Sequence, residues 1–293
     1  MTVVTSTKFE LADGAVHGPY RNVMNPNIHA GEGNIHDQAT AEKLGFRGGT
    51  VAGSNHMDLF PPLAYDQFGR RWFERGSVSL YFRNATLDRE PVRASMRQPR
   101  AKDNVQEDVW IHREDGMLVA EGSLAAGDPG DVPALQRIDV GEISRDGVRI
   151  LADIGTGEAL PAQGYIYTAR EQAERMEIIT EKLTWYEGDS PWGAPIVTPN
   201  GMVSALWGPP TTLLRQRIGK AVGLFGAIEL RNLAGPMLVD TPYAIEGKIL
   251  AVGQSPKTEF FWFETTATDA EGRQVSAMRM LLRFMKGSSE LWA

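Results

Sequence analysis

Apolar and polar residues alternate along several stretches of the first half of the chain, as they do in half-buried strands. The strands predicted in this way are 77–83, 92–98, 107–113 and 117–124, with a shorter one at 8–12. The turn Glu114-Asp115-Gly116 between the last two long strands favours a hairpin. The first half therefore predicts an antiparallel meander.

Helical spacing of apolar residues precedes this meander. It predicts helices over 54–60 and 63–74, with a short helix at 38–44 before them. Pro61-Pro62 separates the two longer segments, and because proline cannot continue a regular helix we expect a break or kink there. Residues 13–30 are rich in Gly, Asn and Pro and are predicted to be loop.

The same order of elements returns in the second half, after a Gly/Pro-rich stretch at 126–137. A helix is predicted over 201–220 and strands over 243–252, 259–268 and 275–284, with a turn at 269–273. Three pairs of segments match in sequence: 46–53 with 192–199, 59–62 with 207–210, and 82–84 with 230–232. Together with the repeated turn, these matches predict a duplication.

The duplication predicts two units, 1–125 and 141–293, joined by a linker at 126–140. Each unit runs from loop to long helix to antiparallel strands, and a sheet of this kind buries one face on its helix. We therefore expect an α+β fold in which two antiparallel sheets each wrap around a long central helix. We also expect the two sheets to meet edge to edge and form one continuous sheet.

The amino-acid composition of the chain argues against several classes of function. Hydrophobic residues make up 42% and charged residues 23% of the 293 residues, which is typical of a globular protein. The net charge of −7 argues against non-specific nucleic-acid binding, and the lack of cysteine excludes disulfides and a cysteine nucleophile. No apolar run approaches the roughly 20 residues that span a bilayer, and residues 1–8 do not resemble a signal peptide. We expect a cytoplasmic protein.

The candidate chemistry lies in a Gly-rich loop. Glu32 and His36 place a carboxylate and an imidazole four residues apart, the usual pair for moving a proton beside a carbonyl. Asn34 either caps the next helix or positions this pair against a substrate. Gly53 opens a predicted helix and offers an unobstructed N–H to an oxyanion. His56 either lines the pocket or is a hydrogen-bonded core residue.

Two motifs carry a family resemblance. Residues 45–53, Gly-Phe-Arg-Gly-Gly-Thr-Val-Ala-Gly, are similar to the Gly-Phe-x-Gly-(Pro/Gly)-(Ile/Val)-x-x-Gly pattern of the MaoC-like dehydratases, also called R-specific enoyl-CoA hydratases. Residues 32–36 resemble that family's Asp-x-Asn-Pro-(Leu/Ile/Val)-His pattern, with a Glu for the Asp, one residue fewer and no proline. We favour a deletion, because a gap-free register would put Ala30 and Ile35 at the acid and imidazole positions. The resemblance implies the double hotdog fold.

The resemblance also implies a hydro-lyase that adds or removes water next to an activated carbonyl or acyl thioester. Glu32 and His36 would be the acid-base pair and the Gly53 N–H the oxyanion donor. No residue set has metal-ligand spacing, and no cofactor is implied. The alternatives are a hotdog thioesterase, which uses a carboxylate and a bound water, and a non-catalytic protein that binds acyl groups.

The second copy has no histidine at the corresponding loop, so we expect one site per chain, near the junction of the halves. Asn34, His56 and Trp207 are the predicted substrate-binding residues. Trp185 and Trp192 are further candidates for the pocket wall, unless they belong only to the core. The expected partner is a small-molecule substrate, with no nucleic acid and no membrane; a homodimer stays an open alternative.

Overall fold

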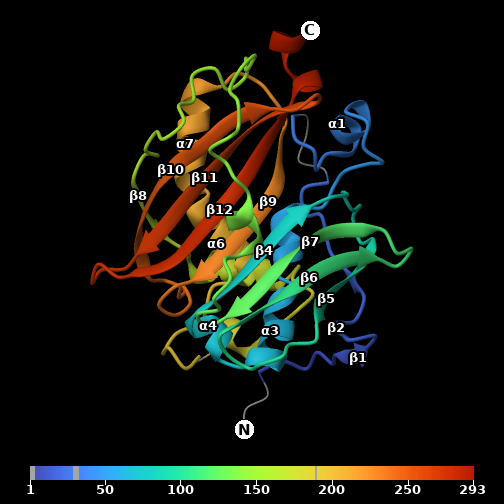
Figure 1. Cartoon of the computed structure of the whole chain (residues 1–293), viewed down its shortest axis with the longest axis vertical. Helices are drawn as coiled ribbons and strands as arrows, with labels where there is room; N and C mark the ends of the chain where they lie inside the picture. Colours follow the sequence, from blue (N-terminus) through green and yellow to red (C-terminus); the bar gives the residue numbers. More distant parts are fainter. Residues whose placement is uncertain (1–3, 29–32, 189) are drawn as a thin grey trace.

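This computed structural model describes residues 4–28, 33–188 and 190–293, and within them twelve strands form one antiparallel sheet (Figure 1). In the first half the strands are β1 (Glu10–Ala12), β2 (Ala15–His17), β3 (Arg21–Asn22), β4 (Gly76–Phe82), β5 (Pro91–Arg97), β6 (Val105–Arg113) and β7 (Leu118–Ala126). In the second half they are β8 (Gln163–Ile166), β9 (Gly223–Asn232), β10 (Pro242–Gln254), β11 (Thr258–Thr268) and β12 (Gln274–Met285).

The two halves join along β4 and β9. The strand order is β1-β2-β5-β6-β7-β4-β9-β12-β11-β10-β8, with β3 also paired to β5. Pairing of β4 with β9 is antiparallel and runs from Gly76 opposite Asn232 to Tyr81 opposite Ala227. The order β5-β6-β7-β4 in one half mirrors β10-β11-β12-β9 in the other, so the expected single continuous sheet is confirmed.

The central helix of each half is broken into short pieces. The helices are α1 (Gln38–Lys43), α2 (Gly53–Met57), α3 (Phe60–Phe68), α4 (Arg71–Glu74), α5 (Ala169–Met176), α6 (Pro199–Leu206) and α7 (Gly208–Arg217). The predicted break at Pro61-Pro62 was misplaced, because both prolines lie in the first turn of α3. Proline is tolerated there, since the N–H groups of a first turn have no partner within the helix. The predicted helix at 201–220 is likewise divided, at Trp207, with Pro209 and Pro210 in the first turn of α7.

Five of these strands and helices were not predicted, and one of them is β9 at the junction of the halves. Strands β2 and β3 lie in the segment expected to be loop, and each pairs with β5. Strand β8 and helix α5 precede the second central helix. Strands of two to four residues, such as β2, β3 and β8, carry too little alternation to be recognised, so pairing with an existing edge decides their conformation.

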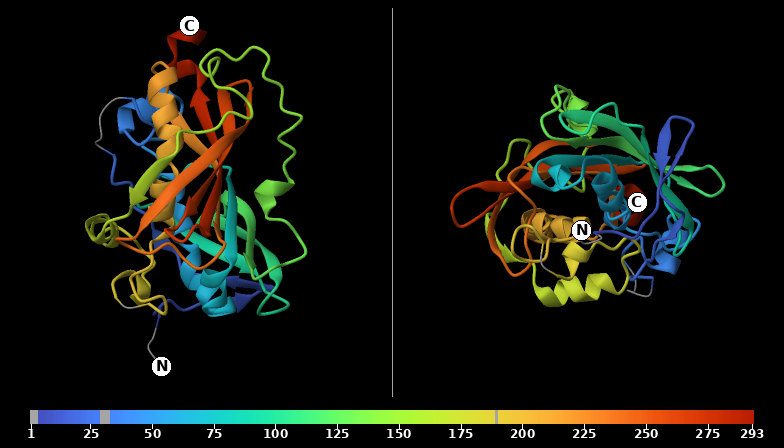
Figure 2. Two further views of the ribbon diagram at one scale, coloured as in Figure 1. Left: turned by 90° about the vertical axis from the view of Figure 1, so that its left-hand side faces the viewer. Right: turned by 90° about the horizontal axis from the view of Figure 1, so that it is seen from below.

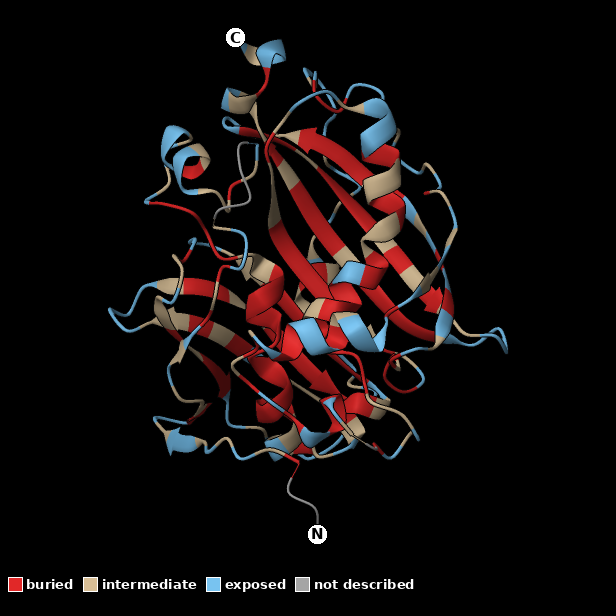
Figure 3. Cartoon of the chain, turned by 180° about the vertical axis from the view of Figure 1, so that it is seen from behind, coloured by how far each residue is buried: buried red, intermediate tan, exposed pale blue. Residues whose placement is uncertain are grey.

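The connection between the halves crosses the outer face of the sheet, away from the helices (Figure 2). Its one regular turn is a 3-10 helix at Ala134–Arg137. Leu135 packs there with Ala227, Trp262 and Leu281 in a small outer cluster. The inner face carries the main core, in which Phe60 and Leu63 of α3, Leu80 of β4, and Phe261 and Phe263 of β11 are fully buried (Figure 3).

A buried polar network ties α2 to the second half. Arg175 of α5 donates through Nε to Asp58 Oδ2 at 2.8 Å and through Nη1 to Asn55 Oδ1 at 3.1 Å. Asn200 of α6 donates its backbone N–H to Asp58 Oδ1 at 2.8 Å and its amide to Ser54 Oγ at 2.9 Å. Burial raises the pKa of Asp58, although the Arg175 guanidinium opposes this. The network fixes α2 against α5 and α6.

Backbone hydrogen bonds test the repeat residue by residue. The Thr50 N–H donates to Ile35 O, and the Ile196 N–H donates to Trp185 O, so the match of 46–53 with 192–199 is confirmed. The match of 82–84 with 230–232 was wrong by two residues. The Arg83 N–H donates to Val119 O, and its counterpart in the second half is the Leu233 N–H, which donates to Val275 O.

None of the described helices is both long and apolar enough to cross a bilayer.

Candidate functional site

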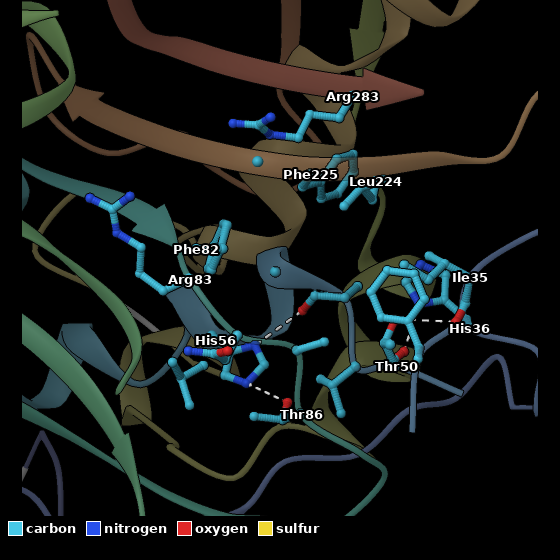
Figure 4. Close-up of a pocket in the computed structure, with 18 of the residues that line it drawn as sticks. Ile35, His36, Thr50, His56, Phe82, Arg83, Thr86, Leu224, Phe225 and Arg283 are labelled. Atoms are coloured by element: carbon cyan, nitrogen blue, oxygen red, sulfur yellow. Dashed lines mark hydrogen bonds between the residues drawn. The ribbon is translucent and has the colours of Figure 1, made fainter. Parts of the chain in front are cut away.

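A cavity of about 170 Å³ lies where β4 and β9 separate (Figure 4). The last paired residues of these strands are Tyr81 and Ala227. Directly beyond them, residues 82–86 form one side of the cavity and residues 223–226 form the other. The loop around His36 and the start of α2 close the inner end. The cavity therefore lies near the junction of the halves, and both halves line it.

His36 lines this cavity from the loop before α1. Its Nδ1 lies 2.7 Å from the Thr50 carbonyl oxygen, which can only accept, so Nδ1 carries the proton. In the neutral ring Nε2 then has a free lone pair and can accept a proton. The Asn34 side chain accepts from the His36 N–H at 2.8 Å, and Asn25 donates to the His36 carbonyl at 2.9 Å. These contacts hold the backbone of the histidine on both sides.

Gly49 explains part of the Gly-rich motif. A Cβ on this residue would lie 2.4 Å from the His36 carbonyl oxygen, well inside van der Waals contact. Only glycine lets the strand-like segment approach the histidine loop so closely. This approach allows the neighbouring Thr50 carbonyl to reach the His36 ring. The motif therefore positions the imidazole.

Gly53 is the first residue of α2 and also lines the cavity. The first N–H groups of a helix have no partner within it, so this N–H can be offered to a ligand. A Cβ on Gly53 would lie 2.7 Å from the ring of Phe82. The glycine is needed for this close contact rather than for a tight turn, because its φ lies outside the positive region.

His56 is buried and both ring nitrogens have partners. Nδ1 lies 3.3 Å from the Ala52 carbonyl and Nε2 lies 3.0 Å from Thr86 Oγ1. The Ala52 carbonyl accepts, so Nδ1 donates and Nε2 accepts from the threonine hydroxyl. Burial lowers the pKa of His56 to about 4, so the ring is neutral near pH 7. His56 lines the cavity and is a hydrogen-bonded core residue as well.

The other predicted site residues have different positions. Glu32 lies outside the described residues. Asn34 is not among the residues lining the cavity; its side-chain oxygen accepts from the N–H groups of His36 and Asp37. Asp37 is the N-cap of α1 and accepts from the Thr40 N–H. Trp207 does not line the cavity either, but its ring centroid lies 5.6 Å from that of Phe225, which does.

Trp185 and Trp192 are not part of the cavity wall. Their rings pack edge to face at 5.5 Å, and Trp185 also contacts Tyr65 and Phe73. The hydrogen bonds above place Trp185 at the position of Ile35, so the next residue, Tyr186, takes the place of His36. The second half therefore carries a buried aromatic cluster at the position where the first half has its site.

Several residues of the site were not recognised from the sequence. Thr86 holds His56, and Asn25 holds the His36 backbone. Arg83 and Arg283 lie at the outer end of the cavity, the second of them contributed by β12 (Figure 4). Residues 82–84 were recognised only as part of the repeat. The sequence pattern of β12 does not single out its arginines. In the part of the chain that the structure describes, no group of His, Asp and Glu could hold a metal ion.

Comparison with known proteins supports the fold. No family model and no curated protein matches the sequence. Among solved structures, a protein described as a MaoC domain dehydratase from Chloroflexus aurantiacus J-10-fl is similar with a TM-score of 0.59 and 12% identity, covering 97% of this chain and 96% of that one. Rv0216 from Mycobacterium tuberculosis, described as having a double hotdog fold, gives 0.56 and 10%, covering 97% of both chains. The GphF dehydratase gives 0.54 and 11%, covering 97% and 98%. The chain thus has the double hotdog fold.

Proposed function

We propose that the protein is a hydro-lyase that adds water to, or removes it from, the carbons next to an activated carbonyl, such as that of an acyl thioester. The observation that carries this proposal is the state of His36. Its Nδ1–H is fixed on the Thr50 carbonyl, which leaves Nε2 as a proton acceptor in a cavity lined mainly by apolar side chains. An imidazole whose Nε2 can accept a proton in this way is suited to general base catalysis.

The proposed reaction needs two proton-transfer groups. In hydration, the oxygen of water bonds to the β-carbon while a base takes its proton, and an acid delivers a proton to the α-carbon. His36 and Glu32 share these two steps, and elimination runs through the same groups in reverse. We carry Glu32 forward as the partner from the sequence motif alone.

The intermediate carries negative charge on the carbonyl oxygen, and Gly53 would stabilise it. The Gly53 N–H belongs to the same peptide unit as the Ala52 carbonyl. His56 Nδ1–H donates to that carbonyl at 3.3 Å, which holds the peptide plane in place. In a trans peptide the N–H points opposite to the C=O, so it points away from the His56 ring. A preorganised donor of this kind is the usual means of stabilising an oxyanion.

The wall residues complete the proposal. Trp207 would influence which substrate sizes are accepted, because it packs against Phe225 of the cavity wall. Asn34 would hold the loop that carries His36 in position. We keep the division into 1–125, 126–140 and 141–293 as the proposed boundaries of the two units.

The thioesterase alternative requires a carboxylate, and among the described lining residues there is none. It therefore depends on Glu32 alone.

Replacing His36 by alanine tests the proposal. We expect His36→Ala to lower kcat for hydration of an enoyl thioester by about 10²- to 10⁴-fold, the usual contribution of general acid–base catalysis, with an unchanged Tm. His17→Ala is the matched control, because this histidine bonds Ser95 and is not among the residues lining the cavity. Activity is followed by loss of the conjugated enoyl absorbance, and thiol release is measured in parallel.

The two readouts separate the alternatives. Thiol release without loss of the double bond would identify a thioesterase, and binding without either change would identify a non-catalytic protein. Full turnover by His36→Ala would show that the imidazole is structural. Glu32→Gln should lose a similar factor if the acid shares the proton transfer.

A further inference from the structure

At the outer end of the cavity, two arginine side chains contact the same tyrosine, Tyr81. The guanidinium carbon of Arg83 lies 4.3 Å from the ring centroid of Tyr81, and Arg283 donates to the Tyr81 hydroxyl. Arg283 also lies 5.6 Å from the ring of Phe260. Arg83 directly follows β4 of the first half, and Arg283 belongs to β12 of the second. Both halves therefore contribute cationic groups to this end of the cavity.

The two arginines differ in how their charge is balanced. Arg83 forms an ion pair with Glu121 at 2.8 Å, and both side chains are 47% exposed. Arg283 is partly buried, and it donates to the neutral oxygens of Tyr81 and Thr258. Within the described residues Arg283 has no ion-pair partner. A partly buried cation held only by neutral acceptors has not recovered its hydration energy and favours an added anion.

The backbone of β9 leaves room for the Arg283 side chain to reach the cavity. A Cβ on Gly226 would lie 2.6 Å from Arg283 Nε, so this glycine allows the arginine to lie across β9. Gly223 and Gly226 both line the cavity, as do Arg283 and His36. A guanidinium has five N–H donors in a planar fork that matches the oxygens of a carboxylate or a phosphate.

We propose that Arg283 is a specificity residue that binds an oxyanion on the substrate, at the end of the molecule opposite the reacting carbons. Arg83 lies on the same tyrosine, but its charge is already paired with Glu121. This inference rests on the proposed function only in assuming that the substrate occupies the same cavity. The half of the chain that lacks the imidazole would thus supply recognition, while the first half supplies the chemistry.

Two sources can supply the oxyanion: a phosphate on the thioester's carrier arm, or a carboxylate at the far end of the acyl group. Binding of saturated thioesters, which cannot be hydrated, separates them. The ligands are butyryl-pantetheine, butyryl-phosphopantetheine and succinyl-pantetheine, so that the first is neutral and the others differ in where the charge lies. Calorimetry with the full-length wild-type protein gives three Kd values.

We expect one of the two anionic ligands to bind about 10- to 100-fold more tightly than the neutral one, as for a charge-assisted hydrogen bond. Arg283→Gln should abolish this preference and leave the affinity for butyryl-pantetheine unchanged. Arg283→Lys, which keeps the charge but loses the planar fork, should retain a smaller preference. Arg93→Gln is the matched control, since that guanidinium also stacks on a tyrosine, Tyr20, at 5.0 Å, and is not among the residues lining the cavity.

Equal affinity of the wild type for all three ligands would overturn the inference, as would a preference that survives in Arg283→Gln. A tighter phosphate ligand assigns the oxyanion to the carrier, and a tighter succinyl ligand assigns it to the acyl group. Because binding is measured without turnover, the preference can be found even if no hydration is detected. Failure of the proposed reaction and failure of this inference are therefore distinguishable.

Discussion

Adding one methyl group at Gly53 should destabilise the protein, against the usual trend for helices. In an open helical position, alanine is more favourable than glycine by up to about 1 kcal/mol. At this position the new Cβ would lie 2.7 Å from Cε2 and 2.8 Å from Cζ of Phe82. Overpacking of this kind costs about 1–3 kcal/mol. The net expectation for Gly53→Ala is a loss of about 1–2 kcal/mol in the free energy of unfolding.

The same change should disturb the site. Phe82 and Gly53 both line the cavity, so a ring displaced by the new methyl group must move within it. We expect KM for an enoyl thioester to rise, and urea unfolding to give the change in stability. Phe82→Leu should relieve the contact, so the double variant should lose less stability than the sum of the two single variants, by about 0.5–3 kcal/mol.

Gly219→Ala is the control, because an added Cβ there has no heavy atom within 4 Å. It should be neutral or slightly stabilising, since alanine restricts the unfolded chain more than glycine does. If Gly53→Ala were more stable than the wild type, or if its effect simply added to that of Phe82→Leu, the close contact between Gly53 and Phe82 would be refuted.

Two further predictions concern the interior. The pKa of His56 is lowered to about 4 in the folded protein, so protonation favours the unfolded chain. The contribution of neutral His56 to the free energy of unfolding should be fully present above pH 6.5 and fall by about 3 kcal/mol between pH 6.5 and pH 4. In urea titrations over that range, the free energy of unfolding of His56→Gln should fall correspondingly less. Separately, Leu224→Ala, in the cavity wall, should shift the preferred acyl-chain length, whereas Trp185→Leu should lower Tm and leave that preference unchanged. A changed preference in Trp185→Leu would place that tryptophan in the site.

The fold was largely predictable because its long strands alternate clearly and its two halves repeat. Positions 46–53 and 192–199 proved equivalent down to single hydrogen bonds, since loop geometry there depends on local residues. The helix breaks were misplaced, because proline marks the first turn of a helix as readily as the end of the previous one. The match at 82–84 failed by two residues, because similar letters in a strand do not fix its register.

The site was only partly predictable for a different reason. The inner end is built from residues close together in the sequence, so His36 and Gly53 could be recognised from a motif. The outer end joins Arg83 to Arg283, 200 positions later, through the pairing of β4 with β9. The sequence showed only scattered arginines, because their grouping depends on how the two halves meet. Trp185 and Trp192 were candidates for the pocket wall with the core as the alternative, and they pack in the core. Aromatic content alone does not reveal which of the two a ring fills.

The position of α2 links the two halves mechanically. This helix carries Gly53 at its start, and its next residues enter the buried network with Arg175 and Asn200 of the second half. A buried ion pair such as Asp58 with Arg175 contributes little net stability, because desolvation offsets its attraction, but breaking it leaves an uncompensated charge. It therefore favours one arrangement of α2 over others. Since β9 of the same half forms the facing wall of the cavity, the second half holds both sides of the site in register. This requirement explains why the aromatic-filled copy keeps its complete scaffold.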